Sequence, residues 1–479
     1  MNRKEILFVF SILFLFIGVY SIGNGLLFYS NPSNPKNNVK HSINIISYPK
    51  SSGESWYIKG DCSKYKIGIN EMDTYNKTGD VYLIGYNGSL AFSDIFLAKY
   101  NALGFQDWNV SLNGGNGNMN YGSDIFINQS SGDVYIVGTI YNGSYGFFDV
   151  FIAKYLPSGS QDWNITWGGL TTIEFGAGIA LDNKGYLYIA GYNYSVGPDD
   201  SDIIVAKFSL KTLKQVWNAT WEASTSNIKE RASDITCGHY GNIYVSGYTD
   251  EDEDQENEMA LICFGEDGLE KWNKTYGETN YNVTGECVAV DSKDDVYIIG
   301  YTLDNDNDGY MVLRKYSNQS DFIWTETWSG TFGFSKGFDI YIDSEDNVIA
   351  SVSGAELGGS KLRVIGYNSG GTQILNLEWR SDSLNSGEFI SSLYISGFNT
   401  DTFYILGICI EFGKNDNYIL VCNPSYSMGS GGGGGLPPDD DDDDDNGGSD
   451  EIPSYNLFII FGIICICSVI LTKKIYKRL

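Results

Sequence analysis

One segment has residues of the type and spacing that bind a hard cation. Asp304, Asp306 and Asp308 alternate with asparagines and precede Gly309, which gives the D-x-D-x-D-G opening of a calcium loop. Three carboxylates at this spacing can converge on one Ca²⁺, and the glycine permits the turn. The twelfth position is Lys315 instead of a bidentate glutamate. The segment therefore predicts either a calcium site or an acidic, solvated hairpin tip, and both interpretations stay open.

Residues for other common chemistries are scarce. The chain has two histidines, His41 and His239, and the second lies in a Gly-His-Tyr-Gly turn. The segment 333–337 matches G-x-S-x-G, but that motif needs a strand-to-helix elbow and a histidine later in the chain. It falls between two expected strands, and no histidine follows residue 239. We predict no catalytic or cofactor-binding residues and a protein that is not an enzyme.

These segments are positioned by a repeat with the pattern V-Y-x-x-G-Y. Its equivalent residues follow one another at steps of 53, 53, 56, 53, 52 and 55. They are Tyr82, Tyr135, Tyr188, Tyr244, Tyr297, Ile349 and Tyr404. Four strand-like runs in each unit of about fifty residues are typical of a β-propeller.

Each unit ends in a strand marked by a tryptophan. These residues are Trp108, Trp163, Trp217, Trp272 and Trp324, and Leu375 takes the place in the sixth unit. The seventh unit ends without a fourth strand, whereas the first has a spare one around Trp56. We therefore predict an all-β, seven-bladed β-propeller of four-stranded blades, closed by an N-terminal strand.

The repeat carries a resemblance to a known family. Gly-Asn/Asp-Val-Tyr-Ile-x-Gly-Tyr, Asp-x-Phe-x-Ala-Lys-Tyr and Gly-x-x-x-Trp resemble the SBBP repeats of bacterial and archaeal β-propellers over residues 55–425. The resemblance implies the propeller fold and a surface or secreted protein, and implies little about activity. Gly-x-x-x-Trp is also similar to the tryptophan-docking repeats of quinoprotein dehydrogenases. Core packing between blades explains the tryptophans more simply.

The two ends of the chain predict a membrane protein. A basic start followed by an apolar run is typical of a secretory signal, and the apolar segment 455–471 followed by lysines and arginine is typical of a stop-transfer helix. The expected segments are a signal peptide or signal anchor (1–22), a linker (23–52), the propeller (53–425), a Gly/Asp-rich stalk (426–453), a transmembrane helix (454–472) and a basic cytoplasmic tail (473–479). The order of Pro453, apolar helix and basic end resembles archaeal sorting signals, including the Asgard type. We predict a propeller on the extracellular side of the cell membrane.

Sequons and cysteines agree with an exterior location. The Asn-x-Ser/Thr sites are Asn76, Asn87, Asn109, Asn128, Asn142, Asn164, Asn193, Asn218, Asn273, Asn282 and Asn318. Four of them directly follow the repeat tryptophan, so glycans there would protect the edges of the outermost strands. Cys409 and Cys422 flank a hairpin and are the favoured disulfide, although six external cysteines allow fifteen pairings.

Charge and loop positions suggest a function. A net charge of −29 repels phosphate backbones, so we expect no nucleic-acid partner. The acidic loops at 199–202, 250–258 and 304–309 each join the second and third strands of a unit, so they should share one propeller face. We predict a cell-surface binding or adhesion scaffold for an extracellular protein or glycan, with possible help from calcium. Alternatives are a structural cell-envelope component and a quinoprotein- or lyase-type enzyme.

Overall fold

The computed structural model describes most of the predicted propeller. It covers residues 45–47, 58–60 and 67–422, apart from 90–91, 103–104, 113–118, 143–146, 170–171, 195–200, 224–227, 251–255, 306–307, 331–333, 357–358, 380–387, 400–401 and 412–416. The predicted signal, stalk, membrane helix and cytoplasmic tail lie outside the described residues. Within the described ranges, no helix is long and apolar enough to cross a membrane.

The described chain is all-β, and its strands form consecutive antiparallel sheets. The first three are β3 (Ile67–Tyr75), β4 (Asp80–Ser89), β5 (Phe92–Tyr100) and β6 (Gln106–Leu112); β7 (Tyr121–Ile127), β8 (Val134–Asn142), β9 (Phe147–Tyr155) and β10 (Gln161–Trp167); and β11 (Ile173–Leu181), β12 (Tyr186–Tyr194), β13 (Ser201–Ser209) and β14 (Lys214–Trp221). The next three are β15 (Arg231–Cys237), β16 (Ile243–Thr249), β17 (Glu258–Phe264) and β18 (Glu270–Tyr276); β19 (Tyr281–Val290), β20 (Val296–Asp304), β21 (Met311–Tyr316) and β22 (Phe322–Trp328); and β23 (Ser335–Ile342), β24 (Val348–Glu356), β25 (Gly359–Tyr367) and β26 (Gln373–Trp379). A three-stranded sheet follows, with β27 (Glu388–Asn399), β28 (Thr402–Glu411) and β29 (Asn417–Cys422).

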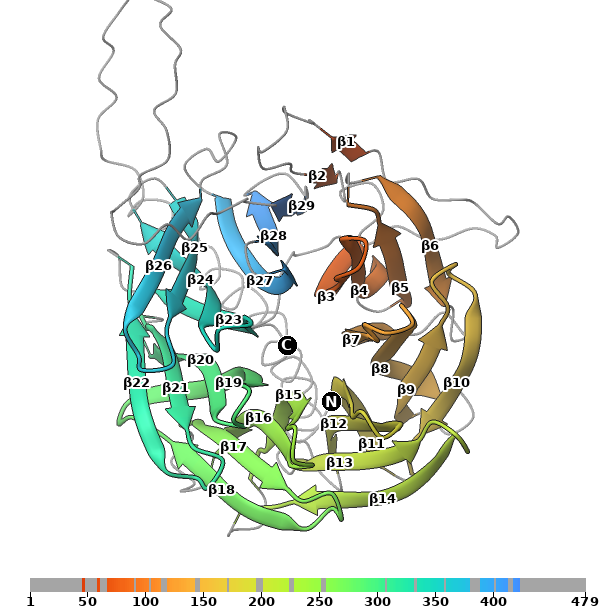
Figure 1. Cartoon of the computed structure of the whole chain (residues 1–479), viewed down its shortest axis with the longest axis horizontal. Coiled ribbons are helices and arrows are strands. Elements are labelled where there is room, and N and C mark those ends of the chain that lie inside the picture. The colour runs from red at the N-terminus through yellow and green to blue at the C-terminus, as the bar shows by residue number, and fades with distance from the viewer. Residues whose placement is uncertain are drawn as a thin grey trace, which may run out of the picture. The chain divides into compact units, whose positions relative to one another are not determined.

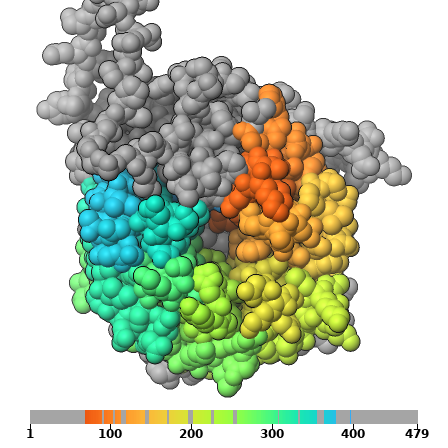
Figure 2. All heavy atoms as spheres, viewed as in Figure 1, coloured from red at the N-terminus to blue at the C-terminus, as the bar shows by residue number. Residues whose placement is uncertain are grey.

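The sheets form a closed ring. The first strand of each sheet contacts the first strand of the next, and β27 contacts β3, so the last sheet meets the first (Figure 1). Figure 2 shows the surface hollowed at the centre, where these innermost strands meet. The prediction of a β-propeller is confirmed, with six four-stranded sheets described.

The expected closure by an N-terminal strand stays a prediction. A short pair, β1 (Ile45–Ser47) and β2 (Ile58–Gly60), precedes the ring, and β2 contacts β29, the outer strand of the three-stranded sheet. Figure 1 shows β2 and β29 side by side. No pairing between them is found in the described residues, and Trp56 lies outside those residues.

A bulge explains the glycine of the repeat. Every innermost strand of the seven sheets contains a register shift near its start. At the β15 bulge, a Cβ atom on Gly247 of β16 would lie 2.0 Å from the carbonyl oxygen of Arg231. The equivalent glycines, Gly85, Gly138, Gly191 and Gly300, have the same close approach, at 1.7–2.3 Å. Only glycine fits where the bulged strand presses on its neighbour.

The repeat tyrosine and tryptophan form the junctions between sheets. Tyr82, Tyr188, Tyr244 and Tyr297 are almost completely buried, and each contacts the tryptophan of its own sheet. The Trp217 indole N–H donates to the carbonyl of Glu266 in the next sheet at 2.9 Å. The interpretation of these tryptophans as packing residues agrees with these contacts.

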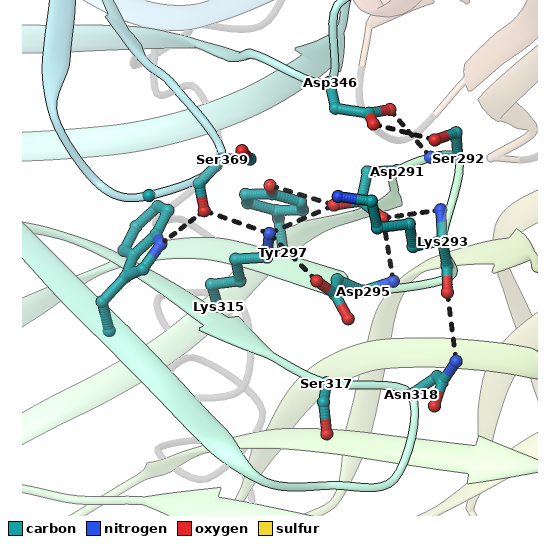
Figure 3. A network of polar contacts seen from close by, with 12 residues as sticks. Asp291, Ser292, Lys293, Asp295, Tyr297, Lys315, Ser317, Asn318, Asp346 and Ser369 are labelled. Atoms are coloured by element: carbon teal, nitrogen blue, oxygen red, sulfur yellow. Dashed lines mark hydrogen bonds and ion pairs between the residues drawn. The ribbon is translucent and has the colours of Figure 1, made fainter.

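A lysine beside four of the repeat tyrosines, Tyr82, Tyr135, Tyr188 and Tyr297, adds ion pairs. Lys315 is the most buried case, with its Nζ 3.1 Å from Asp291 Oδ2 and 3.1 Å from Asp295 Oδ2. Figure 3 shows this amine between the two carboxylates and beside the ring of Tyr297, 4.8 Å from its centroid. The amine also donates to the carbonyl of Ser369, 54 residues further along the chain. The interior therefore carries a hydrogen-bonded charge network as well as apolar contacts.

Candidate functional site

The predicted calcium loop is only partly described. Asp304 and Asp308 close a hairpin, because the Asp308 N–H donates to Asp304 Oδ1 at 2.8 Å and the Asp304 N–H donates to the Asp308 carbonyl at 2.8 Å. Asp306 lies outside the described residues. Among the described residues, no group of three or more His, Cys, Asp or Glu side chains could hold a metal ion. The calcium site stays a prediction.

The other acidic loops are also described in part. Asp199, Asp200 and residues 251–255 lie outside the described residues, whereas Asp202 and Asp250 are half-buried. The three predicted acidic connections do join second and third strands, namely β12 to β13, β16 to β17 and β20 to β21. Since neighbouring strands are antiparallel, these connections lie at the end of the ring where the innermost strands begin.

The rejected catalytic motifs occupy structural positions. His239 is exposed in the turn between β15 and β16, where its backbone N–H donates to Asp294 Oδ1 at 2.7 Å. Ser335 begins β23 and is fully buried, and its hydroxyl accepts the N–H of Gly330 at 2.7 Å. Ser335 is therefore at a strand start and not at a strand-to-helix elbow.

Three of the four edge-strand sequons present an exposed asparagine. Asn164, Asn218 and Asn273 are exposed and Asn109 is half-buried, while the tryptophan before each is half-buried. The alternation along each strand accounts for this difference. Their accessibility suits glycosylation, which stays a prediction here, as it does at the other sequons.

The register of the β28–β29 hairpin does not place the two cysteines of the favoured disulfide opposite each other. Cys409 lies opposite Tyr418 and Cys422 lies opposite Ile405. Cys422 is thus four residues beyond the partner of Cys409, about 13 Å along a strand. A disulfide joins Cα atoms that are less than about 7 Å apart, so this pairing would require a different register. The pairing stays a prediction.

Carboxyl groups follow the bulges on the innermost strands. Asp234 Oδ1 accepts the N–H of Ile235 at 2.6 Å, and its Oδ2 accepts the N–H of Val288 in the next sheet at 3.0 Å. Asp124 bridges to Ile179 of the following sheet in the same way, at 2.7 Å. These carboxylates tie consecutive sheets together, which accounts for their position without a ligand.

Burial raises the pKa of several acidic side chains on the innermost strands. Burial raises the pKa of Asp339 to about 7 and that of Asp73 to about 6, because desolvation outweighs the backbone N–H groups that each carboxylate accepts. Burial also raises the pKa of Glu71 and Asp124 well above the usual range, with the other acids around the axis adding to the effect. The centre of the ring therefore favours protonated carboxyl groups.

A cluster of aromatic and cationic side chains lies where the innermost strands begin. We call it the mouth cluster; it comprises Tyr121, Tyr192, Tyr194, Arg231, Tyr248, Glu286, Tyr301 and Lys336. Its residues come from five consecutive sheets, on first strands and on the ends of second strands. The acidic connections lie at this same end of the ring. Most members are half-buried, so they keep part of their surface open.

Arg231 is the centre of one half of the cluster. Its guanidinium lies over the ring of Tyr192, 5.0 Å from the centroid, and donates to the hydroxyl of Tyr194. Tyr192 in turn stacks on Phe175, with the centroids 5.0 Å apart. Burial raises the pKa of Tyr192 and Tyr248 above the usual range, so both phenols are neutral hydrogen-bonding groups.

Lys336 belongs to the other half. Its Nζ lies 4.1 Å from the centroid of the Tyr301 ring. Burial lowers the pKa of Lys336, and the nearby Glu286 opposes this effect. Burial raises the pKa of Glu286, because desolvation outweighs the opposing contributions of Lys336, Thr284 and Tyr301. Glu286 links the two halves of the cluster, because its charge also helps to raise the pKa of the Tyr248 phenol.

The sequence interpretation missed the mouth cluster, although part of its signal is in the repeat. The tyrosine after the repeat glycine occurs at Tyr192, Tyr248 and Tyr301, each on the second strand of its sheet. Arg231 and Lys336 follow loops that vary in sequence, so no repeat marks them. Their convergence depends on the ring closing.

Comparison with known proteins supports the fold. No protein-family profile matches the chain, and no curated protein matches it either. Among solved structures, polysaccharide lyase Uly1 is 10% identical, with a TM-score of 0.50, and the match covers 74% of this chain and 89% of the lyase. The β-propeller domain of the Trilobed protease from Pyrococcus furiosus is 10% identical, with a TM-score of 0.43, and the match covers 75% and 94%. The acylaminoacyl peptidase of Pyrococcus horikoshii is 10% identical, with a TM-score of 0.46, and the match covers 76% of this chain and 53% of the peptidase.

These comparisons correct one prediction. The chain was expected not to be an enzyme, yet the similar structures include a polysaccharide lyase. The propeller therefore also occurs in enzymes, and the scarcity of histidines does not exclude catalysis. At 10% identity the likeness shows the fold alone. The SBBP resemblance and the archaeal origin stay predictions.

Proposed function

We propose that this protein is a seven-bladed, cell-surface propeller that binds a saccharide at the mouth cluster. The observation that carries the proposal is the group of half-buried tyrosines with neutral hydroxyls around Arg231 and Lys336. A sugar ring has C–H groups on its faces and hydroxyls on its edges. Aromatic rings with polar tips match both features, and convergent polar groups orient such a ligand.

The placement of this site outside the cell rests on the sequence. The predicted signal, stalk and membrane helix would display the ring on the exterior, and the accessible sequons fit that location. In the proposed ring, the N-terminal strand near β29 completes the seventh blade. The mouth and the acidic connections then form the recognition face, with calcium as a possible aid at Asp304, Asp306 and Asp308.

Binding by the tyrosines is tested by calorimetric titration of the full-length chain with neutral and acidic oligosaccharides. Tyr192→Ala should weaken binding at least tenfold, about 1.4 kcal/mol, because it removes a ring from the site. Tyr240→Ala is the matched control, since Tyr240 is 74% exposed in the turn at the opposite end of β16. Equal affinity of the two variants, or no binding of any saccharide by the native chain, would overturn the proposal.

A second candidate is that the site also acts on the saccharide. Burial lowers the pKa of Lys336, and no described carboxylate lies within ion-pair distance of its amine, so the amine could serve as a general base. The similarity of the fold to that of a polysaccharide lyase supports this candidate. An unsaturated product, detected by its ultraviolet absorbance, would support this activity, and its absence with every saccharide that binds would exclude it.

A further inference from the structure

Arg231 is a cation to which the described residues supply no carboxylate partner. No described carboxylate lies within 4.0 Å of its guanidinium, and the groups around it are the phenols of Tyr121, Tyr192, Tyr194 and Tyr248. Its Nε atom is buried and has no hydrogen-bond partner among the described residues. A buried donor left unsatisfied destabilises the folded protein, so a missing acceptor is expected.

Lys336 is the second cation of the mouth cluster. Its amine faces the rings of Tyr301 at 4.1 Å and Phe334 at 5.5 Å, and the described part of the chain supplies it with no ion pair or hydrogen bond. Glu286 is close enough to influence the amine but does not pair with it. Glu286 instead shares hydrogen bonds with Thr284 and Tyr301.

The inward lysines of the repeat make the contrast clear. Each amine of Lys99, Lys154 and Lys315 lies within 3.1 Å of two carboxylates, and that of Lys207 lies 3.8 Å from Glu266. Carboxylates are abundant, since the chain has 60 acidic and 31 basic residues. Two partly desolvated cations that have no carboxylate partner within the described ranges therefore indicate that a ligand supplies the anion.

We propose that Arg231 and Lys336 bind anionic groups, carboxylates or sulfates, of an acidic saccharide at the mouth of the ring. The inference rests on the proposed saccharide site and adds the class of ligand. The planar guanidinium suits the two oxygens of such a group, and the amine supplies a second charge. The tyrosine hydroxyls then bond to the sugar hydroxyls.

The net charge of the protein opposes a polyanion at long range. At physiological ionic strength the Debye length is about 8 Å, so distant carboxylates are screened, whereas contacts in the half-buried mouth are screened less. Affinity for an acidic oligosaccharide should therefore fall only weakly with salt, unlike binding to an exposed basic patch.

The test is titration of the full-length chain with four probes: an oligogalacturonate, a sulfated dextran oligosaccharide, a neutral cello-oligosaccharide and inorganic sulfate. We expect at least one acidic oligosaccharide to bind at least tenfold more tightly than the neutral one. Arg231→Gln and Lys336→Met should each remove this preference, and Arg231→Lys should retain part of it. Arg314→Gln is the matched control, because Arg314 also stacks on an aromatic ring, 3.8 Å from the Tyr276 centroid, but on the outer strands.

Unliganded stability separates loss of binding from loss of folding. Lys336→Met removes an unpaired, desolvated charge, so it should raise the melting temperature of the free protein while it abolishes the increase caused by the acidic ligand. Neutral and acidic saccharides binding equally, or Lys336→Met binding like the native chain, would overturn the anionic inference and leave the saccharide site standing. Inorganic sulfate binding as tightly as the sulfated oligosaccharide would overturn the saccharide as the source of the anion. Failure of every saccharide to bind would overturn both proposals.

Discussion

Lys315→Met should be among the most damaging single changes outside the apolar core. The Lys315 side chain is 3% exposed and that of Asp291 is 0% exposed. Burial alone would lower the pKa of Lys315, but Tyr297, Asp295 and Asp291 outweigh it and raise the pKa to about 12. Removing the amine leaves the Asp291 carboxylate buried without its cation, which costs about 3–5 kcal/mol of unfolding free energy.

A double-mutant cycle isolates the pair. Urea unfolding of the native chain, Lys315→Met, Asp291→Asn and the double variant should show a double variant that is more stable than the sum of the single changes predicts, by about 1–3 kcal/mol. Lys184→Met is the control: its amine is 2.7 Å from Glu266, yet both side chains are about half exposed, so we expect no measurable change. A loss below about 1 kcal/mol for Lys315→Met, or additive single changes, would refute the network of Figure 3 as a stabilising unit.

Three further predictions concern the bulge, the axial acids and calcium. Gly247→Ala should lower the melting temperature strongly, because the new Cβ would lie 2.0 Å from the Arg231 carbonyl oxygen. Gly370→Ala is the control and should be tolerated, because the nearest atom to its new Cβ lies 3.4 Å away. Equal melting temperatures of the two variants would contradict the packing at the bulge. Burial raises the folded-state pKa of Asp339 to about 7 and of Asp73 to about 6, so the folded state binds more protons than the unfolded state, and stability should fall as pH rises from about 4 to 7. Thermal unfolding from pH 4 to 8 checks this, and an Asp339→Asn variant with an unchanged pH slope would count against it. If the loop binds calcium, the melting temperature should be higher with calcium than with chelator. Replacing Asp304, Asp306 and Asp308 by asparagine should remove this difference. A difference that survives the replacement would place the calcium elsewhere.

The repeat predicts the fold because the strands can be recognised in the sequence of each unit. The spacing of Tyr82, Tyr135 and Tyr188 gives the period, and the tryptophans mark the outer strands, as the sheets confirm. The bulge is not visible in this pattern, although the repeat glycine is its consequence. The glycine could have indicated it, since glycine in a strand marks a close backbone approach.

The candidate site could not be predicted to the same degree. Lys207 lies within ion-pair distance of Glu266, which is 59 residues further along the chain. Such partners can be identified only when the arrangement of neighbouring sheets is known. Arg231 and Lys336 lie two sheets apart, each after a variable connection, so only the closed ring brings them to the same mouth. The acidic loops, which the sequence makes conspicuous, lie at the same end but are only partly described.

The location of the bound ligand tests the central claim most directly. A photoreactive acidic oligosaccharide, cross-linked to the full-length chain and mapped by mass spectrometry, should label peptides that contain Tyr192, Arg231 and Tyr248, and an excess of unmodified oligosaccharide should prevent the labelling. Labelling confined to the outer strands β6, β10, β14 and β18, or to the turn at Tyr240 on the opposite face, would contradict a binding site at the mouth of the ring.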